Sequence, residues 1–168
     1  LVFGLMRRME NAWFGPKSGT TAGAPQPARI MLPQPMHVYD LRAGEYLGLT
    51  KQVDTRLKWG RASFFLASPR QITGLSLALS AQNPQPGEPF EATVSLDLPA
   101  GSADKQAVWV QVIDPQGNSP LWGRQVAILE GGKATVPMLI AANDQPGTWR
   151  VRATELFSKQ TAEATWTV

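Results

Sequence analysis

The 168-residue chain contains no cysteine and a single histidine, His37. Without cysteine there can be no disulfide framework, no catalytic thiol and no cysteine-ligated zinc. With one imidazole, a Ser-His-Asp triad or a multi-histidine metal site would need residues from another chain. The chain also lacks an HExxH motif, a Walker-type loop, a nucleophile elbow and a dinucleotide fingerprint. We therefore expect no catalytic, cofactor-binding or metal-binding residue and interpret the chain as a non-enzyme.

Long hydrophobic runs are also absent. The apolar segment Leu1–Met6 is too short for a membrane span, and also for the apolar core of a signal peptide with its flanks. We therefore predict no membrane span. We interpret the chain as a fragment or processed form of a larger protein, whose export signal would lie outside it.

Acidic residues are scarce in the first part of the chain. Residues 1–70 hold ten Lys and Arg against four Asp and Glu, whereas residues 71–168 hold six against nine. The ten basic residues are Arg7, Arg8, Lys17, Arg29, Arg42, Lys51, Arg56, Lys58, Arg61 and Arg70. Such an excess could attract an anionic polymer. The charges are scattered, however, and no aromatic-basic recognition motif accompanies them, so we interpret them as solvated surface and expect no nucleic-acid partner.

Turn-forming residues are abundant. Fourteen prolines and fifteen glycines are spread without a repeat, which indicates many turns and many short strands, and 43% hydrophobic residues suffice for a core. The clearest pattern is the Pro-Gly turn in Asn143–Ala153, which leads into an alternating face of Trp149, Val151 and Ala153. The predicted class is all-β.

The second part of the chain reads as seven strands with turns between them. They centre on Leu75–Leu79, Phe90–Leu98, Val108–Ile113, Leu121–Leu129, Ala134–Ala141, Thr148–Glu155 and Ala162–Val168. Val108–Ile113 is apolar on both faces, as in a central strand. Seven such strands predict an immunoglobulin-like β-sandwich without its cysteine pair, occupying residues 71–168.

The first part, residues 1–70, predicts an antiparallel β-sheet domain that could be incomplete. Leu1–Arg8 fits either a strand or the end of a helix, and Glu10–Pro27 is a long loop. We expect a short strand Arg29–Leu32 bounded by Pro33 and Pro35. Two hairpins should follow. The first joins His37–Leu41 to Glu45–Thr50 across Arg42–Gly44, and the second joins Gln52–Lys58 to Ala62–Ser68, with Val53 and Leu57 on one face and Phe64 and Leu66 on another.

Two stretches resemble known families. The string HVYDLRAGEYLG at His37–Gly48, followed by FFLASP at Phe64–Pro69, resembles the closing β-domain of bacterial glycoside hydrolases of the β-galactosidase type. VIDPQGN at Val112–Asn118, QPGTW at Gln145–Trp149 and the alternating last strand resemble bacterial immunoglobulin-like, fibronectin III-like and macroglobulin-type domains. These resemblances imply an exported bacterial protein, secreted, periplasmic or at the cell surface, in which this chain carries no catalytic residue.

The carboxylates fit this interpretation. Asp40 and Glu45 flank the first predicted hairpin beside Arg42, where a turn-stabilising charge cluster is favoured over the acid and nucleophile of a glycosidase. A calcium site is disfavoured because the loop residues Asp104, Asp114, Asn118 and Asp144 lack EF-hand spacing.

Six tryptophans are many for this length. Trp109, Trp149 and Trp166 belong to alternating strands and should lie in the core, whereas the ligand-binding candidates Trp13, Trp59 and Trp122 occur in loops, turns or at a strand start. Their indoles could pack against the remainder of a larger polypeptide or a protein partner, or stack on polysaccharide. The first alternative predicts non-catalytic accessory domains that support or space a carbohydrate-active region or mediate assembly. The second predicts a carbohydrate-binding module.

Overall fold

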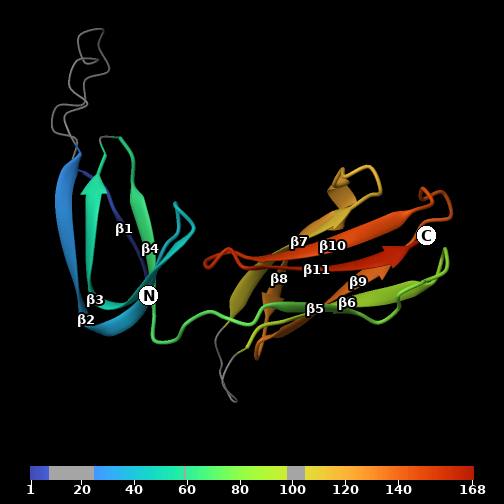
Figure 1. Ribbon diagram of the computed structural model, residues 1–168, viewed down its shortest axis with the longest axis horizontal. Helices are drawn as coiled ribbons and strands as arrows, with labels where there is room; N and C mark the ends of the chain where they lie inside the picture. The colour runs from blue at the N-terminus through green and yellow to red at the C-terminus, as the bar shows by residue number, and fades with distance from the viewer. Residues whose placement is uncertain (8–24, 59, 98–104) are drawn as a thin grey trace, which may run out of the picture. The chain divides into compact units, whose positions relative to one another are not determined.

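The protein is described from a computed structural model that covers residues 1–7, 25–58, 60–97 and 105–168. Within these ranges every strand pairing is antiparallel, and the only other regular element is the 3-10 turn η2 (Leu121–Gly123). The all-β prediction is confirmed. The chain forms two compact units, Leu1–Gln71 and Ile72–Val168 (Figure 1).

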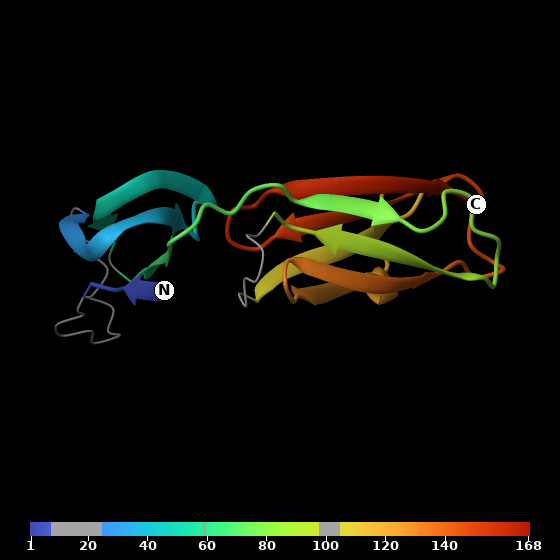
Figure 2. The same ribbon diagram turned by 90° about the horizontal axis from the view of Figure 1, so that it is seen from below.

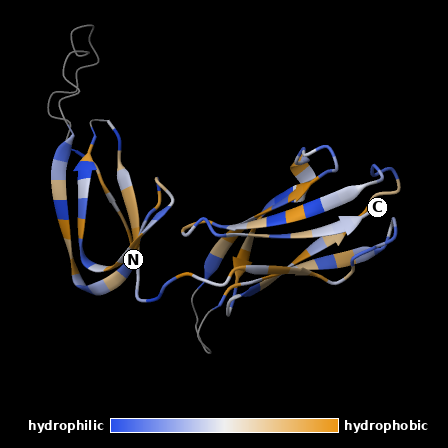
Figure 3. Ribbon diagram, in the orientation of Figure 1, coloured by the Kyte–Doolittle hydropathy of each residue, from blue (hydrophilic) through white to orange (hydrophobic). Residues whose placement is uncertain are grey.

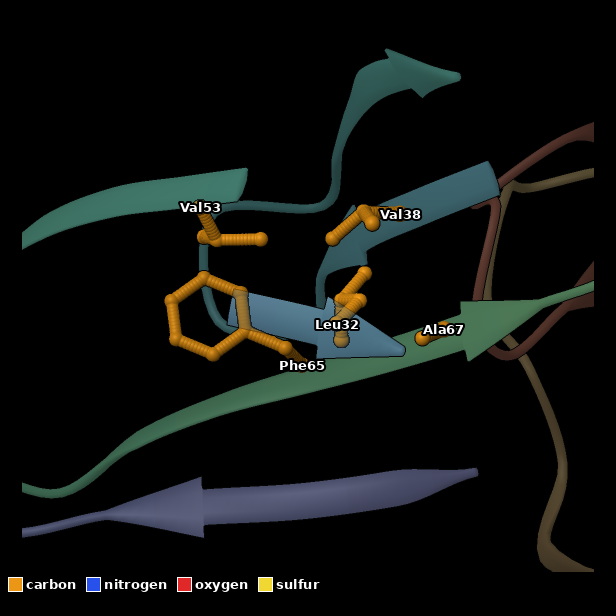
Figure 4. Close-up of a cluster of buried hydrophobic side chains, with 5 residues drawn as sticks. All are labelled: Leu32, Val38, Val53, Phe65 and Ala67. Atoms are coloured by element: carbon orange, nitrogen blue, oxygen red, sulfur yellow. The ribbon is translucent and has the colours of Figure 1, made fainter. Parts of the chain in front are cut away.

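The first unit is one four-stranded sheet with the strand order β1-β4-β2-β3. Its strands are β1 (Val2–Leu5), β2 (Gln26–Asp40), β3 (Glu45–Leu57) and β4 (Ser63–Ser68). The sheet has one principal apolar cluster, formed by Leu32, Val38, Val53, Phe65 and Ala67, all under 5% exposed (Figure 4). Phe3 of β1 stacks on Phe65 with ring centroids 5.6 Å apart, so the first strand closes the cluster from the sheet edge.

Two expectations for this unit were wrong. Pro33 and Pro35 do not end a short strand, because β2 continues through them and bends where its pairing with β3 shifts between Met31 and Met36. A proline costs little where the ladder is already interrupted by an irregularity.

The prediction of a second hairpin, between Gln52–Lys58 and Ala62–Ser68, is also wrong. β4 does not pair with β3 but crosses to the other edge of β2, where His37 lies opposite Ser68 and Asp40 opposite Phe65. Phe65 points into the cluster, and Phe64, which the expected hairpin groups with Leu66 on one face, is 42% exposed while Leu66 is 8% exposed.

The first hairpin forms as expected, with the turn one residue longer. Asp40 pairs with Glu45, and the backbone N–H of Gly44 donates to the carbonyl of Asp40 at 2.8 Å. One carboxylate oxygen of Asp40 also accepts the backbone N–H groups of Arg42 and Ala43, each at 2.9 Å. Gly44 has φ +72°, which an L side chain rarely adopts. The turn is therefore fixed by its own backbone and by Asp40.

The second unit contains seven strands in two sheets. They are β5 (Ser76–Leu79), β6 (Pro89–Ser95), β7 (Gln106–Ile113), β8 (Arg124–Leu129), β9 (Lys133–Leu139), β10 (Thr148–Glu155) and β11 (Thr161–Thr167). One sheet has the order β11-β10-β7-β8 and the other β5-β6-β9. Figure 2 shows the two layers and Figure 3 the alternating hydropathy along their strands. Phe90 of β6 meets Trp166 of β11 edge to face at 5.5 Å, so the inner faces of the two sheets pack together.

The buried residues follow the alternation that the sequence shows. Val108, Val110 and Val112 are at most 2% exposed, and so are Val151 and Ala153 of the neighbouring strand β10. Trp149 and Trp166 are buried as expected. Trp109 is only half-buried, because it occupies the opposite face of β7 from the valines. The centre of this unit is thus the pair β7–β10.

Candidate functional site

The structure describes one of the three candidate tryptophans. Trp13 and Trp59 lie outside the described residues. Trp122 lies in η2, between β7 and β8, and is 57% exposed. Its neighbour Leu121 is 83% exposed, so this turn presents two large apolar side chains to solvent.

Trp122 lines a groove of about 490 Å³. The other lining residues are Pro89, Val112, Gly123, Gln125, Pro137, Met138, Leu139, Ala141 and Asp144. β8 is the edge of the four-stranded sheet and β9 the edge of the three-stranded sheet, and residues of both contribute to the groove. The chain passes from β8 to β9 through the turn at Gly131–Gly132, closed by a bridge between Glu130 and Lys133. The groove therefore lies along the open side of the sandwich, between two unpaired sheet edges.

The Trp122 ring rests on a row of aromatic side chains. Its centroid is 6.3 Å from that of Trp149, which is 6.0 Å from Trp166 and stacked on it, and Trp166 in turn meets Phe90. The inner members of this row are at most 5% exposed. Contacts of this kind restrict an aromatic ring at the surface, so Trp122 presents a supported indole rather than a freely rotating one.

The turn that carries Trp122 is held closely against β7. A Cβ atom built on Gly123 would lie 2.6 Å from the Cβ of Val112, so only glycine fits without a shift. The Gly123 N–H donates to the carbonyl of Pro120 at 3.1 Å, and the Arg124 guanidinium bonds both the hydroxyl and the carbonyl of Ser119. The position of Trp122 is therefore set by backbone packing on one side and a side-chain bridge on the other.

The groove contains little polar surface. Asp144 uses one carboxylate oxygen to accept the N–H of Ala141 at 2.9 Å, which leaves the other for a ligand, and Gln125 contributes an exposed amide. An apolar face with two hydrogen-bonding groups can bind a flat, partly polar ligand or an apolar protein surface. Asp144 is the only carboxylate among the lining residues that the structure describes, whereas glycoside hydrolysis uses a pair of carboxylates.

His37 belongs to an aromatic cluster on the first unit. Its Nδ1 lies 2.6 Å from the hydroxyl of Tyr46, and the two rings are stacked at 5.9 Å. Tyr46 also contacts the buried ring of Tyr39 at 5.0 Å. His37 is therefore paired at the end of a hairpin, and no carboxylate is among its described contacts.

The loop carboxylates are used locally. Asp114 accepts the backbone N–H groups of Gln116 at 2.9 Å and of Asn118 at 2.7 Å, which closes the turn after β7. Asp104 lies outside the described residues. Within the described ranges, no three His, Asp or Glu side chains are grouped so that they could hold a metal ion.

Sequence reasoning missed a second feature, a basic hollow of about 220 Å³ on the first unit. Its lining residues are Asp40, Arg42, Ala43, Thr55, Arg56, Lys58, Arg61 and Ser63. Four of the basic residues that are spread over twenty positions of the sequence thus gather at one place. The sequence feature that pointed to this hollow was the excess of basic residues in residues 1–70. The side chains come together only because the sheet is curved.

Comparisons with known proteins add no family. No family model matches the sequence, and no curated protein matches it. Among the residues that the structure describes, no helix has the length and apolar character needed to cross a membrane. The fold therefore defines the class of the chain as an all-β, antiparallel protein of two units, and its function is a matter of proposal.

Proposed function

We propose that this chain forms two non-catalytic β-domains of a larger exported bacterial protein, and that the Trp122 groove docks the carbohydrate-active region of that protein. The observation that carries the proposal is the groove itself, with Trp122 57% and Leu139 55% exposed along the open side of the sandwich. Contiguous apolar surface of this kind is characteristic of interaction sites.

The sequence motifs support a carbohydrate-active region as the partner that covers the Trp122 groove. The resemblance of residues His37–Pro69 to a glycoside-hydrolase closing domain supports a carbohydrate-active region in the same polypeptide. Covering the groove with another domain would remove the exposed indole and Leu139 from water, at about 25 cal/mol for each Å² of apolar surface buried. The chain would then support or space that region without taking part in chemistry.

The test is a pair of substitutions in the complete parent protein. Trp122→Ser should lower the melting temperature of the carbohydrate-active region, whereas Leu121→Ser should not. Leu121 is the matched control because it lies in the same turn and is more exposed, yet does not line the groove. Equal melting temperatures for Trp122→Ser and the unsubstituted protein would contradict docking through the groove, and turnover of a glycoside by the 168-residue chain alone would contradict the non-catalytic role.

A second candidate function is carbohydrate binding in the same groove. It is favoured by the supported, exposed ring of Trp122 together with Gln125 and the free oxygen of Asp144. The apolar C–H face of a pyranose stacks on an indole, while its hydroxyl groups need hydrogen-bonding partners at the rim.

Titration of the 168-residue chain with soluble and insoluble glycans, followed by tryptophan fluorescence, tests this second function. A glycan that binds here should lose at least tenfold in affinity with Trp122→Ala and remain within twofold with Leu121→Ala. The absence of a response to every glycan would remove carbohydrate binding and leave domain docking.

A further inference from the structure

The basic hollow of the first unit is built by three separate segments of the chain. Arg42 comes from the β2–β3 turn, Arg56 from the end of β3, and Lys58 and Arg61 from the connection between β3 and β4. All four side chains are exposed. Of the described lining residues Asp40 is the one carboxylate, so cations outnumber anions among them by four to one.

Among the residues that the structure describes, no carboxylate forms an ion pair with the cations of the hollow. Asp40 directs one carboxylate oxygen at the Arg42 and Ala43 N–H groups, and in the described part of the chain none of the four cations has an ion-pair partner. The contrast is Arg29 on the same sheet, whose Nε lies 2.8 Å from Asp54. Like charges held together without counter-charges repel one another, and a bound anion would relieve that repulsion.

We propose that this hollow binds an oxyanion group, carboxylate or sulfate, of an acidic polysaccharide. Arginine guanidinium groups match the geometry of such groups with paired N–H donors. Thr55 and Ser63 are also lining residues, and their side chains carry hydroxyl groups that can act as neutral donors. The volume of about 220 Å³ is below the 300–1,000 Å³ common for whole small-molecule sites, so the hollow accepts one charged group rather than a whole ligand.

The lining favours a polysaccharide over a nucleic acid. Among the lining residues that the structure describes, none is aromatic, whereas proteins that hold single strands stack the bases on aromatic side chains. A polysaccharide with one charge per sugar needs only a pocket for the charge and a surface for the rest of the chain. The site is independent of the Trp122 groove, so either can fail without the other.

The test uses the 168-residue chain and four probes, with affinities measured by fluorescence anisotropy or calorimetry at low and moderate salt. The probes are polygalacturonate for carboxylate, dextran sulfate for sulfate, neutral dextran, and an oligothymidylate. We expect binding of at least one acidic glycan, weaker as salt rises, and none of neutral dextran.

The substitutions are Arg56→Gln and the double change Arg42→Gln, Arg61→Gln, with Arg29→Gln as the matched control. Arg29→Gln also removes one arginine charge from the same sheet, but outside the hollow. Affinity for the acidic glycan should fall about tenfold with Arg56→Gln and further with the double change, and by less than twofold with the control. Arg56→Lys should recover part of the loss, because it restores the charge without the paired donors.

Three results would overturn the proposal. They are equal losses with Arg29→Gln and Arg56→Gln, which would indicate general charge attraction; no binding of either acidic glycan; or tighter binding of the oligothymidylate than of both glycans. All four positions are exposed, so the variants should fold, and unchanged circular dichroism and melting temperature would establish that they do.

Discussion

Glu155 is the single buried charged residue of the described chain, with no exposed surface. One carboxylate oxygen accepts the backbone N–H of Phe157 at 3.0 Å, the N–H of Ser158 at 2.6 Å and the hydroxyl of Ser158 at 2.7 Å. Three donors on one buried oxygen fix the β10–β11 turn, and removing that oxygen leaves all three without an acceptor. A fully buried donor without a partner costs about 1–3 kcal/mol, and these part-buried donors should each cost toward the lower end of that range.

We therefore predict that Glu155→Ala lowers the free energy of unfolding by about 2–4 kcal/mol, measured by urea denaturation. Glu155→Gln should lose less, since its amide oxygen can still accept from the turn. Glu88→Ala is the control, because Glu88 is exposed, and it should remain within about 0.5 kcal/mol of the unsubstituted chain. A Glu155→Ala variant as stable as Glu88→Ala would contradict the structural role of this carboxylate.

The burial of Glu155 could have been predicted from the sequence, whereas the packing of Trp122 against Trp149 could not. Glu155 continues the two-residue period of Trp149, Val151 and Ala153, so the pattern already places it on the inner face. The sequence indicated Trp122 because it stands at the start of the predicted strand Leu121–Leu129. Its support by Trp149 connects residues 27 positions apart and depends on how η2 packs against β7, which no local pattern records.

At the scale of elements, the last hairpin carries an ion pair that should respond to pH. Glu163 of β11 lies opposite Arg152 of β10 and bonds its guanidinium, with Arg150 3.5 Å away. The hydrogen bond from Arg152 lowers the pKa of Glu163, partial burial opposes the shift, and the charges of Arg152 and Arg150 add to the lowering. The folded pKa is thus below the unfolded one, so the pair stabilises the fold above the unfolded pKa of about 4.3.

This contribution should disappear as the pH falls from about 5 through the lowered folded pKa. We predict that the unfolding free energy of the unsubstituted chain decreases more between pH 5 and pH 3 than that of Glu163→Gln. The quantity to compare is the difference between the two proteins. The pKa values of Asp54 beside Arg29 and of Glu130 beside Lys105 are also lowered, so these groups change the stability of both proteins in the same direction. The pair is exposed, so the difference should be small and should shrink in 0.5 M salt. Identical pH profiles at low salt would contradict it.

Elements with regular alternation were predictable, and those shaped by long-range pairing were not. Thr148–Glu155 is the same in the sequence analysis and in the structure, because its period of two places apolar side chains on one buried face. β2 and β4 differ from their predictions. The local sequence favours a strand that ends at proline and a β3–β4 hairpin, whereas in the sheet β2 bends and continues and β4 pairs with the other edge of β2. The basic hollow depends on that same bend, so it was not accessible from sequence.

At the scale of the whole molecule, the division at Gln71–Ile72 predicts that the second unit is an independent folding unit. Its core lies between its own two sheets, and Ile72, 3% exposed, belongs to it. The carbonyl of Ile72 also accepts the side-chain amide of Gln160 at 2.6 Å, which fixes the first residues of the unit to the β10–β11 turn. The residues just before β5 are therefore part of the fold rather than a passive connection.

A fragment of residues 72–168 should accordingly unfold in one cooperative transition, followed by circular dichroism in urea. Ile72→Ala in this fragment should lower the unfolding free energy by about 2–4 kcal/mol, since it removes a buried side chain and leaves a cavity. Thr73→Ala is the control, because Thr73 is adjacent and exposed and should cost less than about 0.5 kcal/mol. A fragment that unfolds without a transition, while the 168-residue chain shows one, would mean that the first unit is required for the second to fold. Equal stability of the two variants would mean that the unit begins after Ile72.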